Sequence, residues 1–171
     1  MFPKNRKYRI LVVDDTPMNI DMLETILSDE GYEVHAATNG KESIALANTM
    51  NPDLILLDIV MPGMDGYEAC RTIKSNPEIV DVPIIFLTSK SESEDVVKGF
   101  KAGAVDFVSK PFHGAELLAR VNTHIQLIET RREAERLLLN VLPSPIAKEL
   151  RENGSRFRHP RFGTSFRPKN F

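Results

Sequence analysis

The chain has 171 residues, of which 42% are hydrophobic and 27% are charged, and its formal net charge is −2. This length accommodates one domain of ordinary size with an appendage. The single cysteine, Cys70, excludes an intramolecular disulfide and a cysteine-rich metal site. No apolar run approaches the ~18 residues of a membrane span, and the run at residues 10–13 is too short for a signal peptide. We therefore expect a cytoplasmic protein that has no membrane partner.

Short apolar runs alternate with amphipathic segments from residue 8 onward. We expect strands at residues 9–13, 33–37, 54–57, 83–88 and 104–108, and helices at residues 17–30, 40–50, 65–75, 91–101 and 114–142. Thr16 as N-cap and Pro17 should begin the first helix, and Gly31 should end it. This alternation predicts an α/β fold, a doubly wound parallel five-stranded (βα)5 sheet with helices on both faces.

The last predicted helix is longer than a small domain can cover. After Gly114 no proline or glycine interrupts it, and apolar residues recur at a three-four spacing, namely Leu118, Val121, Ile125, Ile128, Leu139 and Leu142. We expect this extended C-terminal helix to form a homodimer by pairing with a second copy in a short coiled coil. The alternative is a long helix that packs back on its own domain or frays. Pro143 and Pro145 should break the helix and leave residues 146–150 for one further turn.

The charge is unevenly distributed. Residues 151–171 carry six Lys or Arg against one acidic residue, a net charge of +5, which leaves −7 on residues 1–150. We divide the chain into a domain at 1–127, an extended helix at 128–150 and a basic, disordered tail at 151–171. Arginine and phenylalanine alternate in this tail, as in segments that contact nucleic acid. Short basic tails are more often solvated chain ends, so we expect no nucleic-acid partner.

Chemically active residues follow four of the predicted strands. The carboxyl ends of parallel strands meet at one edge of such a sheet, so Asp14, Asp15, Asp58, Thr88 and Lys110 should lie together. Three neighbouring carboxylates call for a divalent cation, and oxygen ligands without His or Cys indicate Mg²⁺ or Mn²⁺. Lys110 and Thr88 supply donors for phosphoryl oxygens. Asp58 alone would more often simply end a strand, but the combination favours a carboxylate that accepts a phosphoryl group as an acyl phosphate.

The motif set resembles the receiver domain of two-component response regulators over about residues 8–127. The motifs are Asp14-Asp15, Asp58-Ile59-Val60-Met61-Pro62-Gly63-Met64-Asp65-Gly66, Thr88-Ser89, and Gly103-Ala104 through Lys110-Pro111-Phe112. The resemblance implies a flavodoxin-like fold and phosphorylation of Asp58 by a sensor histidine kinase or a phosphotransfer protein. It also implies Mg²⁺ held by Asp15, Asp58 and the backbone carbonyl of Val60, with Asp14 acting mainly through a water.

The same resemblance implies a conformational switch. Lys110 would contact the phosphoryl group, and the peptide bond before Pro111 would be cis. Thr88 would move toward the phosphate, and Phe107 would turn inward after it. The position of Phe107 is often Tyr in the family, so the switch would lack a phenolic hydrogen bond, and Ser89 stands where a smaller Ala is common. The fourth helix, fifth strand and fifth helix form the face expected to change.

A second stretch, residues 134–150, is similar to the signalling helix that precedes class III adenylate or guanylate cyclase domains. No cyclase body follows within the 171 residues, so we expect a phospho-accepting signalling protein and not an enzyme. Two alternatives are a metal-dependent phosphatase or phosphotransferase, which would need a substrate cap, and a DNA-binding regulator with a truncated output. The latter would need a helix-turn-helix after Leu142, where two prolines stand.

Overall fold

The structure is a computed structural model that describes residues 6–89 and 93–153. The chain separates into two compact units, residues 1–131 and residues 132–171. The predicted disorder of the tail concerns mostly residues 154–171, which lie outside the described residues.

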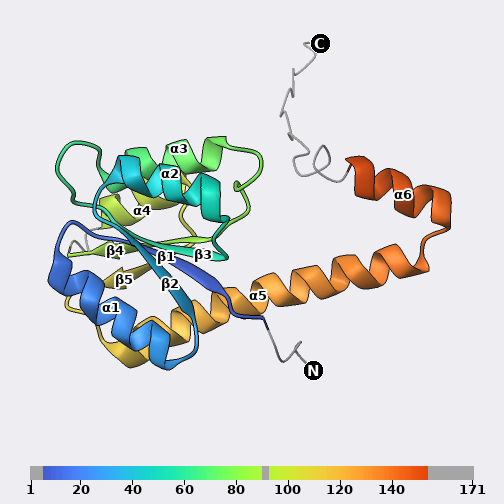
Figure 1. Ribbon diagram of the computed structural model, residues 1–171. Helices are drawn as coiled ribbons and strands as arrows, with labels where there is room; N and C mark the ends of the chain where they lie inside the picture. The colour runs from blue at the N-terminus through green and yellow to red at the C-terminus, as the bar shows by residue number, and fades with distance from the viewer. Residues whose placement is uncertain (1–5, 90–92, 154–171) are drawn as a thin grey trace, which may run out of the picture. The chain divides into compact units, whose positions relative to one another are not determined.

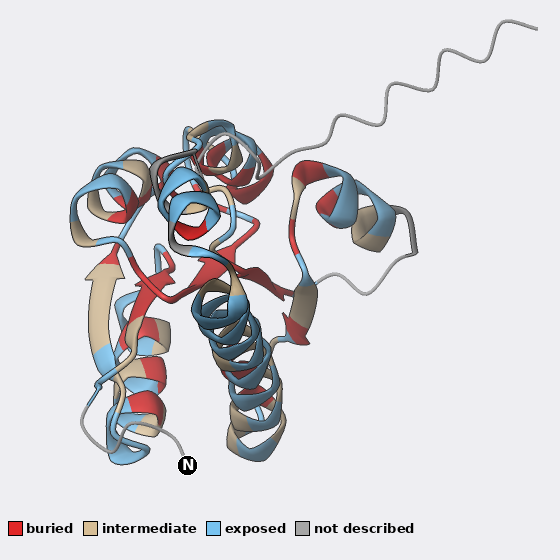
Figure 2. Ribbon diagram, turned by 90° about the vertical axis from the view of Figure 1, so that its right-hand side faces the viewer, coloured by how far each residue is buried: buried red, intermediate tan, exposed pale blue. Residues whose placement is uncertain are grey.

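Five parallel strands form one sheet in the order β2-β1-β3-β4-β5. They are β1 (Arg9–Val13), β2 (Glu33–Ala37), β3 (Leu54–Asp58), β4 (Ile84–Thr88) and β5 (Asp106–Ser109). Every residue of β3 and β4 is buried, as expected for continuous apolar runs covered on both faces. Figure 2 shows the central strands in red, as buried, whereas the edge strand β2 is mostly tan and the outer sides of the helices are largely pale blue. The predicted fold class is confirmed.

Helices cover both faces of the sheet (Figure 1). The described helices are α1 (Pro17–Asp29), α2 (Gly40–Met50), α3 (Gly66–Ser75), α4 (Ser93–Ala102), α5 (Gly114–Val141) and α6 (Ser144–Asn153), and those that cover the sheet are α1 to α4 and the first part of α5. Ala47 of α2, Ile73 of α3 and Ala102 of α4 belong to one apolar cluster, whereas Leu23 of α1 and Val121 of α5 belong to the other. None of the described helices combines the length and the apolar character that a bilayer span requires.

The first half of α5 is part of the core of the sheet-containing unit. Leu117, Val121 and Ile125 are buried against the sheet, and Leu118 and Ile128 pack beside them. The predicted coiled-coil seam was therefore wrong in its first half, because Val121 and Ile125 are already covered by their own domain. The periodicity alone could not distinguish a partner helix from the sheet.

Several predicted boundaries need correction. β5 begins at Asp106 and not at residue 104, because the N–H of Ala104 still donates to the carbonyl of Gly99 at the end of α4. α6 is longer than one turn and includes residues 151–153, and Pro145 lies in its first turn, where a missing N–H costs nothing. Thr16 is the N-cap of α1, but its side chain makes no capping hydrogen bond.

Candidate functional site

The predicted residues meet at the carboxyl ends of the four neighbouring strands β1, β3, β4 and β5. Asp14 and Asp15 follow β1, Asp58 ends β3, Thr88 ends β4, and Lys110 follows β5. One carboxylate oxygen of each of the three aspartates lies within 4.8 Å of those of the other two. The backbone N–H of Lys110 donates to the carbonyl of Thr88 at 2.8 Å, which joins the ends of β4 and β5.

Asp14 is fully buried, and both of its carboxylate oxygens accept hydrogen bonds. Oδ1 accepts from the N–H of Thr16 at 2.9 Å, and Oδ2 is paired with Nζ of Lys110 at 2.8 Å. The side-chain amide of Asn19 donates to both oxygens, at 3.1 and 3.0 Å. These donors leave Asp14 less available for direct metal ligation than the exposed Asp15. Sequence reasoning missed Asn19, although a polar residue in the first turn of the next helix was a usable signal.

Asp58 has only 3% of its surface exposed. Its Oδ2 lies 3.1 Å from Nζ of Lys110, and its Oδ1 accepts from the N–H of Val60 at 3.2 Å. Burial raises the pKa of Asp58 above its ordinary value, and the nearby Asp14 carboxylate adds to this increase, although Lys110 and the Val60 N–H oppose it. The contacts with Lys110 and the Val60 N–H therefore offset only part of the free energy that the Asp58 carboxylate loses when it leaves water.

Lys110 lies between two carboxylates. Burial would lower its pKa, but hydrogen bonds to Asp14 and Asp58 outweigh burial and raise it, so the side chain stays charged. Three ionised carboxylates and one ammonium leave a local charge of −2, the charge that one divalent cation neutralises.

The donor set fits Mg²⁺. Mg–O distances of about 2.1 Å in an octahedron place ligand oxygens about 3.0 Å apart when adjacent and about 4.2 Å apart when opposite. One oxygen of each carboxylate lies within 4.8 Å of the other two, a limit slightly larger than the greatest ligand spacing in that octahedron. Val60, whose N–H contacts Asp58, is 58% exposed at the edge of this cluster.

The two predicted switch residues have different surroundings. Thr88 is buried at the end of β4. The ring of Phe107 is half-buried and lies 6.0 Å from that of Phe86 and 5.1 Å from that of Phe100, centroid to centroid. The ring also lies against Gly99, because a Cβ there would be 2.6 Å from Cζ of Phe107. Phe107 thus connects the sheet with α4. The Lys110–Pro111 peptide bond is cis.

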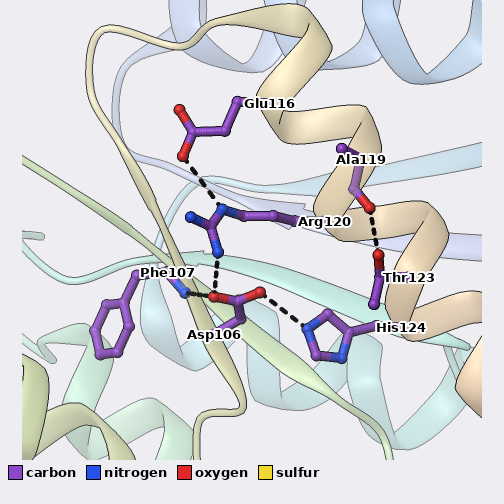
Figure 3. A network of polar contacts seen from close by, with 7 residues as sticks. All are labelled: Asp106, Phe107, Glu116, Ala119, Arg120, Thr123 and His124. Atoms are coloured by element: carbon purple, nitrogen blue, oxygen red, sulfur yellow. Dashed lines mark hydrogen bonds and ion pairs between the residues drawn. The ribbon is translucent and has the colours of Figure 1, made fainter.

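A polar network connects β5 with α5 next to Phe107 (Figure 3). Oδ1 of Asp106 accepts from the N–H of Phe107 at 2.8 Å and from Arg120 at 2.7 Å, and Oδ2 lies 3.0 Å from Nε2 of His124. Burial would raise the pKa of Asp106, but the hydrogen bonds from Phe107, His124 and Arg120 hold it below its ordinary value. Sequence reasoning missed this network, although the i, i+4 spacing of Arg120 and His124 on α5 was a usable signal.

The fold and the acidic edge define a receiver domain. The family model for the response regulator receiver domain matches residues 10–122, and the chain belongs to this family. Receiver domains are signalling domains, generally without catalytic output of their own.

Two curated relatives and one solved structure illustrate the similarity. The DNA-binding response regulator MtrA of Mycolicibacterium smegmatis is 40% identical over 120 residues, which cover 70% of this chain and 51% of MtrA. A Vibrio cholerae protein named "Probable cyclic di-GMP phosphodiesterase" is 44% identical over 131 residues, 77% of this chain and 29% of that protein. The receiver domain of the sensor histidine kinase PA1611 from Pseudomonas aeruginosa has a magnesium ion coordinated in its active site cleft. It matches at 34% identity with a TM-score of 0.66, covering 71% of this chain and 99% of that domain.

The chain therefore spans about half the length of MtrA and less than a third of the Vibrio protein.

Proposed function

We propose that this chain accepts a phosphoryl group on Asp58 from a histidine kinase or a phosphotransfer protein in the cytoplasm, in a reaction that requires Mg²⁺ or Mn²⁺. One observation carries the proposal: three carboxylates lie within 4.8 Å of one another beside an ammonium that contacts two of them. Asp15, Asp58 and the backbone carbonyl of Val60 would hold the metal, and Asp14 would act through a water. The metal supplies charge neutralisation for the phosphoryl oxygens.

Asp58 is the nucleophile of the proposed transfer. One of its carboxylate oxygens forms a bond to phosphorus while the bond from phosphorus to the donor histidine nitrogen breaks, and the imidazole leaves. Lys110 is the ammonium within reach of the transferred group, since its Nζ lies 3.1 Å from Oδ2 of Asp58. The hydroxyl of Thr88 donates a further hydrogen bond after the transfer. The new charge of nearly −2 then biases Phe107 and α4 toward a second arrangement.

Intact-mass analysis after incubation with Mg²⁺ and acetyl phosphate tests this proposal. We expect one phosphoryl adduct that requires the metal and is absent from Asp58→Asn. Asp65→Asn is the matched control, because Asp65 caps α3 through the N–H of Glu68 and asparagine caps helices equally well. An adduct that persists in Asp58→Asn, or its absence from the natural sequence with Mg²⁺ bound, would contradict the proposal.

The output would pass through the C-terminal helix, with residues 1–127 as receiver and residues 128–150 as linker. Exposed apolar residues support self-association: Leu127, Leu138 and Val141 are uncovered and, together with Ala134, follow a seven-four-three spacing. Sedimentation velocity should detect a dimer that Leu138→Lys weakens and Asn140→Lys, at an exposed position two residues away, does not. A dimer unaffected by Leu138→Lys would exclude this surface.

Two kinds of output are candidates for a protein that carries this receiver domain. The similarity of residues 134–150 to a cyclase signalling helix supports a nucleotide cyclase. The name of MtrA, at 40% identity, favours a DNA-binding output as the second candidate. The chain itself should form no cyclic AMP or cyclic GMP, and metal-dependent formation of either nucleotide by the purified chain would contradict this expectation.

A further inference from the structure

The loop between β3 and α3 is held by backbone hydrogen bonds at both of its ends. The N–H of Ile59 donates to the carbonyl of Leu87 at 3.3 Å, which fixes the start of the loop to β4. At the other end, the N–H of Gly66, the first residue of α3, donates to the carbonyl of Ile59 at 2.8 Å. Val60 lies between these two attachments, and its N–H contacts the Asp58 carboxylate.

Gly66 packs directly against the main chain of the phosphoacceptor. A Cβ at this position would overlap the carbonyl oxygen of Asp58, and it would lie 2.7 Å from Cα of Ile59 and 2.9 Å from the carbonyl carbon of Asp58. All three are backbone atoms of a buried strand end, so none can move aside without moving the site itself. The first turn of α3 can approach β3 this closely only because residue 66 has no side chain.

Two other glycines of the region differ from Gly66. A Cβ at Gly40 would meet only the flexible side chain of Met64, at 2.8 Å from its Cγ. Gly63 has a φ of +78° and would meet nothing within 4 Å. Glycine is favoured at position 63 because the turn needs a positive φ there. Glycine is favoured at position 66 because a side chain would overlap the backbone beside Asp58.

We infer that Gly66 is a positioning residue for the metal site: its contact with the main chain of Asp58 and Ile59 sets where the Asp58 carboxylate and the Val60 carbonyl stand relative to Asp15. This inference rests on the proposed function. A methyl group at position 66 displaces α3 or the strand end. Mutation of residues that orient metal ligands without binding the metal typically lowers metal affinity by roughly tenfold or more.

Calorimetric titration of metal-free protein with Mg²⁺ tests this inference. We expect Gly66→Ala to lower Mg²⁺ affinity by about tenfold or more. Gly40→Ala, the matched control, should stay within about twofold, because the Met64 side chain can yield. Far-UV circular dichroism and thermal unfolding without metal establish that each variant is folded. A folded Gly66→Ala protein with unchanged Mg²⁺ affinity would overturn the inference while leaving the proposed function intact. Absence of Mg²⁺ binding in the natural sequence would overturn both.

A second measurement needs no variant at position 66. In the natural sequence, saturating Mg²⁺ should slow hydrogen exchange of the Gly66 amide by about tenfold more than that of the Gly31 amide. The Gly31 N–H donates to the carbonyl of Ser28 at 2.9 Å, just after α1, and it corrects for any general gain in stability. Equal effects of Mg²⁺ on the two amides would refute the positioning role even if Gly66→Ala does not fold.

Discussion

Replacement of Asp58 by asparagine should stabilise the metal-free protein, although it removes an ion pair. Lys110 contacts both Asp58 and Asp14, so in the variant its ammonium keeps Asp14 as a partner at 2.8 Å. Burial of Asp58 disfavours its charged form, and asparagine carries no charge to desolvate. The variant therefore lacks the repulsion between Asp58 and Asp14 and the desolvation cost of the Asp58 carboxylate. It also lacks the attraction between Asp58 and Lys110.

The charge terms nearly cancel. With an effective dielectric constant of ~20, attraction between Asp58 and Lys110 at 3.1 Å is about 5 kcal/mol. Repulsion from Asp14, at 4.8 Å or less, is about 3.5 kcal/mol or more, and the exposed Asp15 adds less because water screens it. Because the attraction and the repulsion differ by only about 2 kcal/mol, the desolvation of Asp58 decides whether the variant is more or less stable than the natural protein. We expect Asp58→Asn to raise the free energy of unfolding by about 1 kcal/mol, or the melting temperature by about 2–4 °C.

Thermal unfolding at several pH values, with and without Mg²⁺, measures this effect. The folded-state pKa of Asp58 is raised, so the natural protein loses stability as pH rises from ~4 through that pKa. The advantage of the variant should therefore be complete at neutral pH and vanish below about pH 4. Mg²⁺ at tenfold excess over its Kd should add about 1.4 kcal/mol to the natural protein and less to the variant. An Asp58→Asn protein less stable than the natural one at pH 7 without metal would refute this reasoning.

Three further outcomes follow from other contacts. Gly99→Ala should cost about 1–3 kcal/mol in urea denaturation, since its methyl would meet Phe107, and a double variant with Phe107→Ala should lose less than the sum of the two single changes. Additive losses would mean that the two residues do not interact. Asp106→Ala should cost about 1–3 kcal/mol at pH 7 in thermal unfolding. Because the folded-state pKa of Asp106 is lowered, this cost should disappear as pH falls below about 4, and a cost unchanged at pH 3 would argue against the ion pairs. Burial raises the pKa of Cys70 to about 11, so iodoacetamide at pH 8 should label it in urea but not in the folded protein, as read by mass spectrometry; equal labelling rates would contradict its burial.

Local patterns were sufficient for the elements of the receiver fold. Strands β1 and β2 have the predicted bounds, because a short apolar run and its flanking turn residues specify a buried strand without reference to distant residues. Asn39 and Asp65 cap their helices through the N–H groups of Glu42 and Glu68, as turn and capping residues indicate. The extent of α6 was harder to predict, because a proline in a first turn resembles a helix breaker in sequence.

The sequence by itself determined which residues stand at the ends of the strands, and hence that Asp14, Asp58 and Lys110 would meet at one edge of a parallel sheet. That outcome follows from strand order and direction, which the alternation of strands and helices already implies. Only the tertiary structure decided that Asn19 binds Asp14, that Asp106 joins β5 to Arg120 and His124, and which side of α5 is covered. These contacts join side chains that belong to different elements, so their distances depend on how whole elements pack.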